Sequence, residues 1–414
     1  MRFNYWIWLF VVLLVGCKSK PTEPDQPQPG GQLTSGTANF SQYLAVGNSL
    51  TAGYMNGGLY RESQLASYPN LLAQRFRMAN GGAFVQPLFP DGQQNGSGYY
   101  RLANTQPAGG LPVLEQVTAN TAIRSQSPLM LTKYTGAAPD NIGIPGIRLA
   151  DVQNQALSQV NPYFERLLPN GQETMTYLAY VKSRPHTFFS CWIGINDVLG
   201  FVTSGGRQPI TSPAIFRDNL NVLLDALTAN NVKGVLANLT DITDMPYLTA
   251  RTVAQLRGSQ NATIYIRTGT GVVRPATEED YVLYDADSIG LANRTGFFKG
   301  YFSAYPLNNE DVLDAEEVRQ AQSAIEAFNK IIADEAAARQ LPVMNAQALM
   351  RRVKTGFTQD NILFSPIFPT GEAFSLDGIH PTARGYALLA NEYLKTINTF
   401  YQTQFPLYNL NTLR

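Results

Sequence analysis

Residues 43–54 read YLAVGNSLTAGY, an apolar run that ends in Gly, Asn and Ser before a second Gly. The apolar run predicts a short buried strand over residues 43–46, and Gly47 allows the chain to turn sharply where that strand ends. Ser49 would therefore stand at the carboxyl end of a strand, which is where open α/β sheets bind their ligands. Gly-Asn-Ser is also a common turn sequence, so this stretch alone leaves a simple turn open.

A second polar motif lies near the end of the chain, where residues 376–382 read LDGIHPT just before a helical stretch at 383–399. Asp377 precedes His380 by three residues on a turn into a helix, so its carboxylate can accept a hydrogen bond from the imidazole. An imidazole held in this way can take a proton from a serine hydroxyl. The chain contains only two His, and the other, His186, has no carboxylate at a comparable spacing.

The composition is that of a globular chain. With 414 residues, of which 44% are hydrophobic and 15% charged, the chain can form a sizeable core in one large domain or two. The formal net charge is +0 and no basic stripe stands out, which argues against a nucleic-acid-binding protein.

Strands and helices alternate along the middle of the chain. Residues 187–194 form the clearest buried strand, an amphipathic helix follows at 214–230, and another strand follows at 234–239. This switching of the hydrophobic period indicates βαβ units and a parallel sheet. Further expected elements are helices at 68–76 and 312–339, a strand end near 141, a β-hairpin at 263–274 and a short strand at 341–346.

Two long stretches interrupt this alternation, at residues 80–139 and 241–306. The first is rich in Gly, Pro, Gln and Tyr, and its apolar content is too high for disorder. We expect an ordered insertion that walls the active site, because long structured loops in compact domains tend to be functional. The second contains the expected hairpin.

The first residues have the features of a targeting segment. Arg2 is followed by an apolar run at 5–15, too short to span a bilayer comfortably, and then by the sequence LVGC at residues 14–17. Small residues just before a Cys resemble the lipobox of bacterial lipoproteins, which implies cleavage before Cys17 and lipidation of that residue. An ordinary secretory signal with an incidental Cys is the alternative. If Cys17 carries lipid, Cys191 is left alone and is expected to be a buried small hydrophobe.

These features divide the chain into three parts. Residues 1–16 are expected to form a lipoprotein signal peptide, and residues 17–38 a flexible tether rich in Pro, Gln and Gly. Residues 39–414 are expected to form one hydrolase domain that contains both insertions.

Four short blocks then occur in an order that resembles the GDSL-type esterases and lipases, also called SGNH hydrolases. The blocks are Gly47-Asn48-Ser49-Leu50, Gly146, Gly194-Ile195-Asn196-Asp197 and Asp377-Gly378-Ile379-His380-Pro381. The resemblance covers residues from about 42 to 399, outside the two insertions. It implies an α/β fold in which a three-layer α/β/α sandwich encloses a central parallel sheet, the flavodoxin-like fold of that family.

The resemblance also implies a role for each block. Ser49 would be the nucleophile, His380 the general base and later the general acid, and Asp377 the residue that orients the imidazole. The backbone N–H groups of Ser49 and Gly146 and the side-chain amide of Asn196 would hold the oxyanion.

Two positions depart from the family pattern. Asn48 stands where the family has the Asp that names it; this neighbour of the nucleophile is not a triad member, so we expect the change to be tolerated. Gly143 competes with Gly146 for the oxyanion role. We favour Gly146 because the family pattern places an Asn several residues ahead of the glycine.

The expected reaction is two-step acyl transfer to water through an acyl-Ser49 intermediate, with no metal ion and no organic cofactor. A carboxylic ester with a modest or long acyl chain is the first expected substrate, and removal of acetyl groups from a polysaccharide is the second. A metal hydrolase could instead use Asp377 and His380 as ligands, but two His make its ligand set thin. A surface lipoprotein that only binds glycan or lipid would leave the filled catalytic positions unexplained.

The expected partners follow from this assignment. They are an ester substrate, either a lipid or an acylated glycan, and a bacterial membrane held through the N-terminal lipid. No nucleic acid is expected, and the chain is expected to act as a monomer. We expect it in the cell envelope, on the periplasmic or surface side of the outer membrane.

Overall fold

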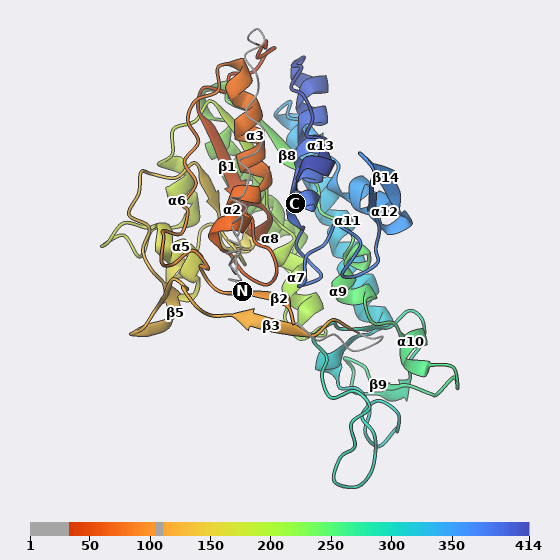
Figure 1. Cartoon of the computed structure of the whole chain (residues 1–414). Coiled ribbons are helices and arrows are strands. Elements are labelled where there is room, and N and C mark those ends of the chain that lie inside the picture. The colour runs from red at the N-terminus through yellow and green to blue at the C-terminus, as the bar shows by residue number, and fades with distance from the viewer. Residues whose placement is uncertain (1–32, 104–110, 414) are drawn as a thin grey trace, which may run out of the picture. The chain divides into compact units, whose positions relative to one another are not determined.

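The expected first strand is present in the computed structural model, which describes residues 33–103 and 111–413. This strand, β1 (Tyr43–Gly47), is buried along its whole length. It pairs in parallel with β6 (Asn141–Gly143) on one side and with β7 (Phe188–Trp192) on the other. β8 (Lys233–Ala237) and β13 (Val343–Met344) continue the parallel sheet beyond β7 (Figure 1). The predicted α/β fold class with a central parallel sheet is confirmed.

The order of the strands decides where a ligand can bind. The sheet runs β13-β8-β7-β1-β6. Of its strands, β6 comes second along the chain and lies on one side of β1, whereas the later strands β7, β8 and β13 lie on the other side. This is the flavodoxin-like order, in which the chain reverses direction across the sheet between β1 and β7. Ligands of such sheets bind at the carboxyl ends of the strands on either side of that point.

Helices cover both faces of the sheet, because successive strand residues point to opposite sides. Leu44 and Val46 of β1 belong to a buried cluster with α8 (Pro213–Leu227) and α11 (Ala315–Ala338). Tyr43 and Ala45 belong to a second cluster with α3 (Tyr68–Phe76), α12 (Ala346–Thr355) and α13 (Ala383–Tyr401). α3 and α13 lie side by side in Figure 1. The three-layer sandwich expected from the sequence is therefore present.

Most predicted boundaries agree with the structure within a few residues, and one differs for a clear reason. α11 begins at Ala315 and not at residue 312, because Val312 and Leu313 pair as β12 (Val312–Leu313) with β11 (Tyr281–Val282). Asp314 then caps the helix by accepting hydrogen bonds from the backbone N–H groups of Glu316 and Glu317.

Several shorter helices connect these elements. They are α1 (Ser49–Ala52), α2 (Arg61–Ala66), α4 (Leu157–Val160), α5 (Pro162–Leu167), α6 (Tyr177–Lys182) and α7 (Asn196–Thr203).

Both insertions are ordered in the part of the chain that the structure describes. The first contains two antiparallel pairs, β2 (Tyr99–Leu102) with β3 (Leu114–Val117) and β4 (Ile123–Arg124) with β5 (Ser127–Leu131). The second contains α9 (Pro246–Thr249), α10 (Val253–Arg257) and the predicted hairpin, which is confirmed as β9 (Tyr265–Arg267) and β10 (Val273–Pro275). A last small hairpin, β14 (Phe357–Gln359) with β15 (Ile362–Phe364), precedes α13.

The expected signal peptide, residues 1–16, and Cys17 lie outside the described residues. Within residues 33–38, which the sequence assigns to the tether, Leu33 donates a backbone hydrogen bond to Met78 and Thr37 donates one to Tyr401. These residues pack on the folded domain, here called the body, which therefore begins before the predicted residue 39. None of the described helices is long and apolar enough to cross a membrane. Cys191 is a free thiol buried in the sheet, as predicted.

Candidate active site

Ser49 is the first residue of α1 and is separated from the end of β1 by Asn48 alone. A Cβ on Gly47 would lie 2.3 Å from the carbonyl oxygen of Trp192, so only glycine lets β1 end this close to β7. Asn48 caps α1, because its Oδ1 accepts a hydrogen bond of 3.0 Å from the backbone N–H of Leu50. An aspartate could accept the same bond, so the family's Asp and this Asn can both cap the turn that presents Ser49.

The structure brings Ser49, His380 and Asp377 together in one hydrogen-bonded chain. His380 Nδ1 lies 2.9 Å from Asp377 Oδ2, and His380 Nε2 lies 2.8 Å from Ser49 Oγ. An ionised carboxylate only accepts hydrogen bonds, so Nδ1 donates to Asp377 and Nε2 is left to accept the Ser49 hydroxyl proton. The Tyr54 ring lies against the imidazole, with centroids 4.6 Å apart. The imidazole is thus held in the orientation that proton transfer from Ser49 requires.

Asp377 is held as a carboxylate by several donors. Its Oδ1 accepts from the backbone N–H groups of Ile379 and His380 and from the Ser375 hydroxyl, and its Oδ2 also accepts from the N–H of Gly57. Burial raises the pKa of Asp377, but the charge and hydrogen bonds of His380 and the backbone donors outweigh burial and lower it. The carboxylate therefore stays ionised beside the imidazole.

A tight turn at Asn56 and Gly57 fixes the position of this carboxylate. The Asn56 N–H donates to Ser375 Oγ at 2.8 Å, and Asn56 Oδ1 accepts from the Leu376 N–H at 3.0 Å. The Ser375 hydroxyl in turn donates a hydrogen bond to Asp377 Oδ1, so it links the Asn56 turn to this carboxylate. These residues were not predicted from the sequence, although an Asn-Gly pair is a strong turn signal.

Each insertion supports one side of this arrangement. From the first, Tyr100 donates its N–H to the Asn56 carbonyl oxygen at 2.7 Å, and its ring covers Gly57. From the second, Tyr247 donates its N–H to the Gly378 carbonyl oxygen at 2.9 Å, within the turn that carries Asp377. The insertions therefore brace the residues around the imidazole, while the expectation that the first one walls the active site stays a prediction, because none of its described residues lines the pocket beside Ser49.

The second sequence block forms a tight turn after β6. Ile147 donates its N–H to the Ile144 carbonyl oxygen at 3.2 Å, and Gly146 has φ +79°. Pro145 followed by a glycine of positive φ fits a type II turn, which requires glycine at this position. Asn161 fixes the turn by donating its side-chain amide to the Pro145 carbonyl oxygen at 2.8 Å.

The same geometry decides between the two candidate glycines. Gly143 is buried in β6, and its N–H already donates to Asn141 Oδ1 at 3.0 Å. The N–H groups of Gly146 and Ser49 donate to no acceptor within residues 33–103 and 111–413. Among the described residues, the N–H of Gly146 is therefore free while that of Gly143 is used, and the oxyanion role that the family resemblance implies for Gly146 stays a prediction.

Asn196 and Asp197 tie the third block to this turn. Asn196 donates one amide N–H to the Ile147 carbonyl oxygen at 2.9 Å, which leaves its second amide N–H for a ligand. The buried Asp197 carboxylate accepts from the backbone N–H groups of Leu149 and Ala150 at 2.6 and 3.1 Å. Asp197 thus holds the segment that follows the turn against the start of α7.

The Asp197 carboxyl predicts a pH-dependent component of stability. Burial raises its pKa from 3.8 to about 6. As pH rises from about 4 to 6, the unfolded chain releases this proton before the folded chain does, so stability falls by about 3 kcal/mol and then levels off. Asp197→Asn should lack this component. Urea denaturation of both proteins at pH 4 and pH 7 measures it, and an equal pH dependence in the two would contradict the assignment.

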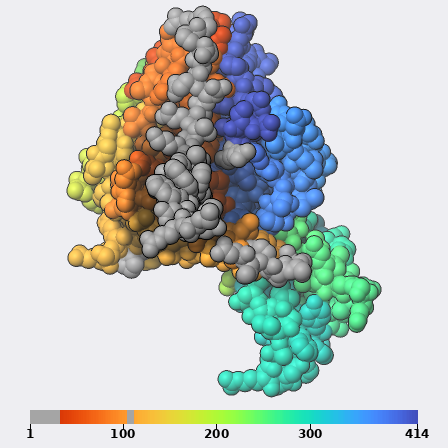
Figure 2. Space-filling model, viewed as in Figure 1, coloured from red at the N-terminus to blue at the C-terminus, as the bar shows by residue number. Residues whose placement is uncertain are grey.

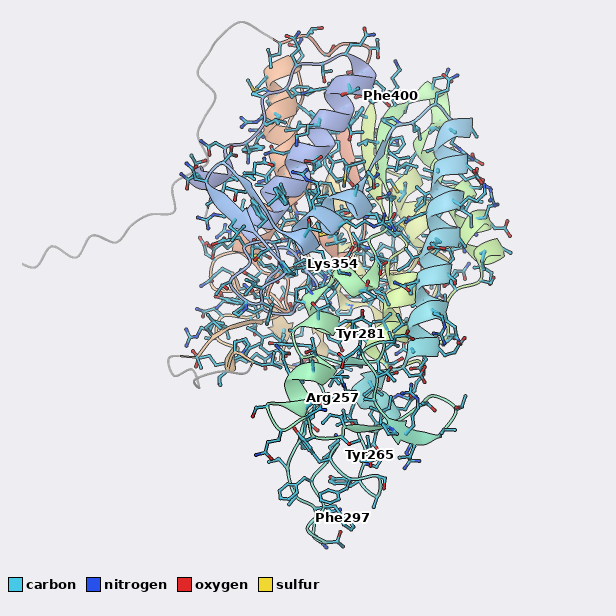
Figure 3. The ribbon with its side chains drawn as sticks, turned by 90° about the vertical axis from the view of Figure 1, so that its right-hand side faces the viewer. Arg257, Tyr265, Tyr281, Phe297, Lys354 and Phe400 are labelled. Carbon is cyan, nitrogen blue, oxygen red and sulfur yellow. The ribbon has the colours of Figure 1, made fainter. Side chains whose placement is uncertain are left out.

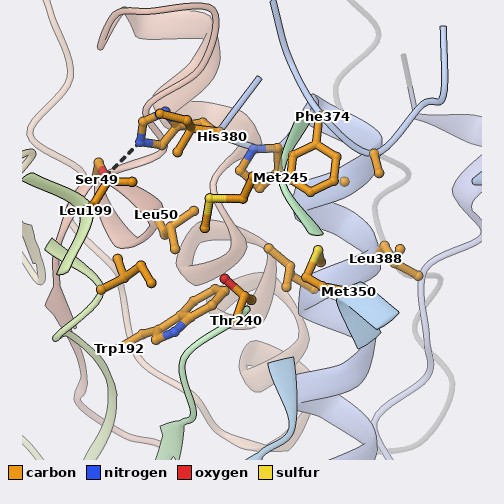
Figure 4. Close-up of a pocket in the computed structure, with 16 residues that line it drawn as sticks. Ser49, Leu50, Trp192, Leu199, Thr240, Met245, Met350, Phe374, His380 and Leu388 are labelled. Carbon is orange, nitrogen blue, oxygen red and sulfur yellow. Dashed lines mark hydrogen bonds between the residues drawn. The ribbon is translucent and has the colours of Figure 1, made fainter. Parts of the chain in front are cut away.

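An apolar pocket of about 650 Å³, including its opening to solvent, begins at Ser49 and His380. Figure 4 shows these two residues on one side and Met350 and Leu388 on the other, with Trp192 and Met245 between. Almost every lining side chain is apolar. The full lining is Ser49, Leu50, Trp192, Ile195, Leu199, Thr240, Met245, Met350, Ala373, Phe374, Ile379, His380, Pro381, Gly385, Leu388 and Leu389. Except for Ser49, His380 and block neighbours such as Leu50 and Ile379, these residues were not predicted from the sequence.

The second histidine lies away from this site. The two ring nitrogens of His186 face the carbonyl oxygens of Arg184 and Leu227, at 2.8 and 2.9 Å. Among the described residues, no three His, Cys, Asp or Glu side chains are grouped so that they could hold a metal ion. A hydroxyl paired with an oriented imidazole, beside an apolar pocket, is suited to attack on an acyl carbonyl.

Comparisons with known proteins agree with this chemistry. A family model described as GDSL-like Lipase/Acylhydrolase matches residues 43–393, which span all four sequence blocks. A search of curated proteins finds no match.

Three solved structures are similar at low identity. LAE5, an alpha/beta hydrolase from the metagenome of Lake Arreo in Spain, is 13% identical, with a TM-score of 0.39 over 88% of this chain and 97% of that one. A form of Axe2, an acetyl xylan esterase from Geobacillus stearothermophilus, is 11% identical, with a TM-score of 0.36 over 87% and 95%. An extracellular lipase from Streptomyces rimosus is 13% identical, with a TM-score of 0.35 over 86% and 98%.

Proposed function

The chain belongs to the GDSL-like lipase/acylhydrolase family, and from that membership we propose that it hydrolyses carboxylic esters through an acyl-Ser49 intermediate. The observation that carries the assignment of Ser49 is its 2.8 Å contact with His380 Nε2, while His380 Nδ1 contacts Asp377. A nucleophile, a base and an orienting carboxylate thus come from opposite ends of the chain and meet at the switch point of the sheet.

Each step of the reaction has a residue placed for it. Ser49 Oγ attacks the acyl carbon while His380 Nε2 takes the hydroxyl proton. The imidazolium then returns the proton to the leaving alcohol, and the acyl group stays on Ser49. Water, deprotonated by His380, releases the acid and restores the hydroxyl. Asp377 keeps the imidazole in place and stabilises its positive charge in both halves.

The negative oxygen of the tetrahedral intermediate needs donors at the same place. The free backbone N–H groups of Ser49 and Gly146 and the second amide N–H of Asn196 are the donors we assign to it.

Removing the Asn196 side chain tests this oxyanion site. Asn196→Ala should lower kcat by about 10²- to 10³-fold and change KM little, because the donor acts mainly on the charge that develops in the transition state. Steady-state kinetics on a p-nitrophenyl ester measures both constants. Asn219→Ala is the matched control, since this α8 amide contacts Gln153 and not the active site. Equal losses of kcat in the two variants would contradict the assignment of Asn196 to the oxyanion site.

The pocket beside Ser49 supports an apolar acyl chain as the group that is transferred. Its polar side chains are few, and its apolar lining extends from Ser49 to Met350 and Leu388 on the far side. Each methylene group that leaves water contributes about 0.8 kcal/mol, or roughly a fourfold gain in binding. We therefore propose esters with medium or long acyl chains as substrates, in preference to acetylated polysaccharides.

Chain-length dependence tests this assignment. On p-nitrophenyl esters, kcat/KM should rise roughly fourfold with each added methylene until the pocket is full. Met350→Trp, at the far side of the pocket, should lower kcat/KM for the longest esters by about tenfold or more and leave the acetyl ester unchanged. Met350→Leu, which keeps the volume, is the control.

Other outcomes of the same assay assign other functions. Acetate release from an acetylated polysaccharide, with only short esters cleaved, would identify a carbohydrate esterase. A body that turns over none of these esters would be a binding protein.

We also propose that the mature chain is lipid-anchored through Cys17 at a bacterial membrane. The support is the sequence alone: an apolar run, small residues and a Cys, followed by a Pro-rich segment. Mass spectrometry of the mature N-terminus should find it at a diacylated Cys17, and Cys17→Ser should abolish the modification. An unmodified mature N-terminus elsewhere would contradict the anchor.

A further inference from the structure

A turn in the second insertion displays hydrocarbon side chains on the outside of the molecule. Leu291 is 63% exposed, and three nearby rings, Phe297, Phe298 and Phe302, are 37%, 46% and 40% exposed. The ring centroids of Phe297 and Phe298 lie 5.2 and 6.3 Å from that of Phe302. We call these four residues the aromatic tip. Phe297 lies at the outer end of the second insertion in Figure 3, and residues near 300 form a protruding lobe in Figure 2.

The aromatic tip is held by a defined backbone structure. Ala292 and Phe298 form an antiparallel bridge, and Asn293 Oδ1 accepts from the backbone N–H groups of Thr295 and Phe297. At its base, the buried Lys299 ammonium donates to Asp311 at 2.9 Å. The exposed rings are therefore presented in a fixed arrangement and are not simply part of an irregular loop.

The insertion does not need these rings for its own core. That core is a separate buried cluster, which also takes in two residues just after the insertion; its members are Val253, Ile264, Ile266, Ala276, Val282, Ala286, Leu307 and Val312. None of the four aromatic-tip residues belongs to it. Exposed hydrocarbon that serves no internal packing marks a surface for a partner.

The chemistry of the aromatic tip narrows the choice of partner. Phe and Leu carry no hydrogen-bonding group, whereas the hydroxyl groups of a sugar call for polar partners beside the stacking ring. Residues 288–309 contain no Asp or Glu, and their two basic residues are the exposed Arg294 and the buried Lys299, which pairs with Asp311 and, at the base of the turn, with the exposed Asp287. The hydrocarbon side chains of the aromatic tip match the acyl region of a lipid layer, and the Arg294 guanidinium beside them matches anionic headgroups.

We propose that the aromatic tip inserts into the surface of an anionic lipid membrane. Phe297, Phe298 and Leu291 enter the acyl boundary, and Arg294 contacts lipid phosphates. The insertion also contacts the active site, through the hydrogen bond from Tyr247 to Gly378. Membrane contact at the aromatic tip is a property of the body itself, independent of the acylation of Cys17 and of ester hydrolysis.

Vesicle flotation of the body from residue 32 onward tests the proposal. The described residues of this body form one compact unit with their own cores, and without residues 1–31 no lipid anchor contributes. The body should bind vesicles of phosphatidylcholine with phosphatidylglycerol more tightly than vesicles of phosphatidylcholine alone. Phe297→Ser with Phe298→Ser should weaken binding to both by about tenfold or more, because two rings lose their burial. Arg294→Glu should weaken binding several-fold to the anionic vesicles only.

Phe400→Ser is the matched control. Phe400 is 48% exposed on α13 and lies at the opposite end of the molecule from Phe297 in Figure 3. It should bind vesicles like the parent, and circular dichroism should show all variants folded. The proposal is overturned if the parent body binds neither vesicle, if the double variant binds as the parent does, or if Phe400→Ser loses as much. It is also overturned if the double substitution instead abolishes binding to an insoluble polysaccharide.

Discussion

Ser49→Ala is expected to lower kcat/KM for ester hydrolysis by at least about 10⁴-fold, the largest effect of any single change in this chain. Within residues 33–103 and 111–413, the Ser49 hydroxyl is the hydrogen-bond partner of His380 Nε2, at 2.8 Å. Without it no acyl-enzyme can form, and only the donors and the pocket remain to assist direct attack by water. KM should change little, because the pocket is intact.

The measurement is steady-state hydrolysis of a p-nitrophenyl ester, with a thermal melt to show that the variant is folded. Ser190→Ala is the matched control, because Ser190 is a buried hydroxyl of the same sheet that contacts Tyr43 at 2.6 Å and not His380. It should lose about 1 kcal/mol of stability and little activity. If Ser49→Ala were fully active, the nucleophile would have to be a residue other than Ser49.

His380→Gln is expected to reduce kcat by about 10³- to 10⁴-fold. The glutamine side chain can still hydrogen bond to Ser49 or Asp377, but it cannot take the hydroxyl proton or return it to the leaving alcohol. The loss should appear in kcat and much less in KM.

The other histidine of the chain provides the comparison. His186→Gln is chemically the same substitution, but the His186 ring nitrogens contact the Arg184 and Leu227 carbonyl oxygens, just before the start of β7 and away from Ser49. This variant should lose some stability and keep its kcat. Equal losses of kcat in the two variants would show that neither histidine acts as a base.

The strand ends could be predicted from the sequence because strand and turn signals coincide there. The apolar run of β1 and the glycine after it are local features, and so are the β7 run and the spacing of Asp377 and His380. In a parallel sheet such strand ends share one edge, so local patterns sufficed to predict that Ser49, Asn196 and the Asp377 turn lie close together. The structure joins Ser49 to the Asp377 turn through His380 and puts Asn196 at the start of α7; their catalytic roles are what the variants above test.

The pocket and the supports of Asp377 could not be predicted in this way. Met245, Met350 and Leu388 belong to separate segments, and their apolar character is the same as that of ordinary core residues. Which of them faces a cavity depends on how α12 and α13 pack. The contact between Asn56 and Ser375 joins residues at opposite ends of the chain and has no local signature.

The choice between Gly143 and Gly146 also needed the structure. The sequence offers two glycines after a strand, and only the hydrogen bond from the Gly143 N–H to Asn141 Oδ1 shows that this donor is already used. The start of α11 is a similar case, since the pairing of Val312 and Leu313 with β11 is a tertiary contact that helix periodicity does not reveal.

The most direct test of Ser49 as the nucleophile is covalent labelling with a fluorophosphonate. A serine activated by a base and oxyanion donors reacts with this phosphorus centre and keeps the adduct. We predict one adduct per chain, found by mass spectrometry on the peptide that contains Ser49, absent in Ser49→Ala and formed far more slowly in His380→Gln. An adduct on a different residue, or ester hydrolysis that continues with Ser49 unlabelled, would contradict the assignment of Ser49 as the nucleophile.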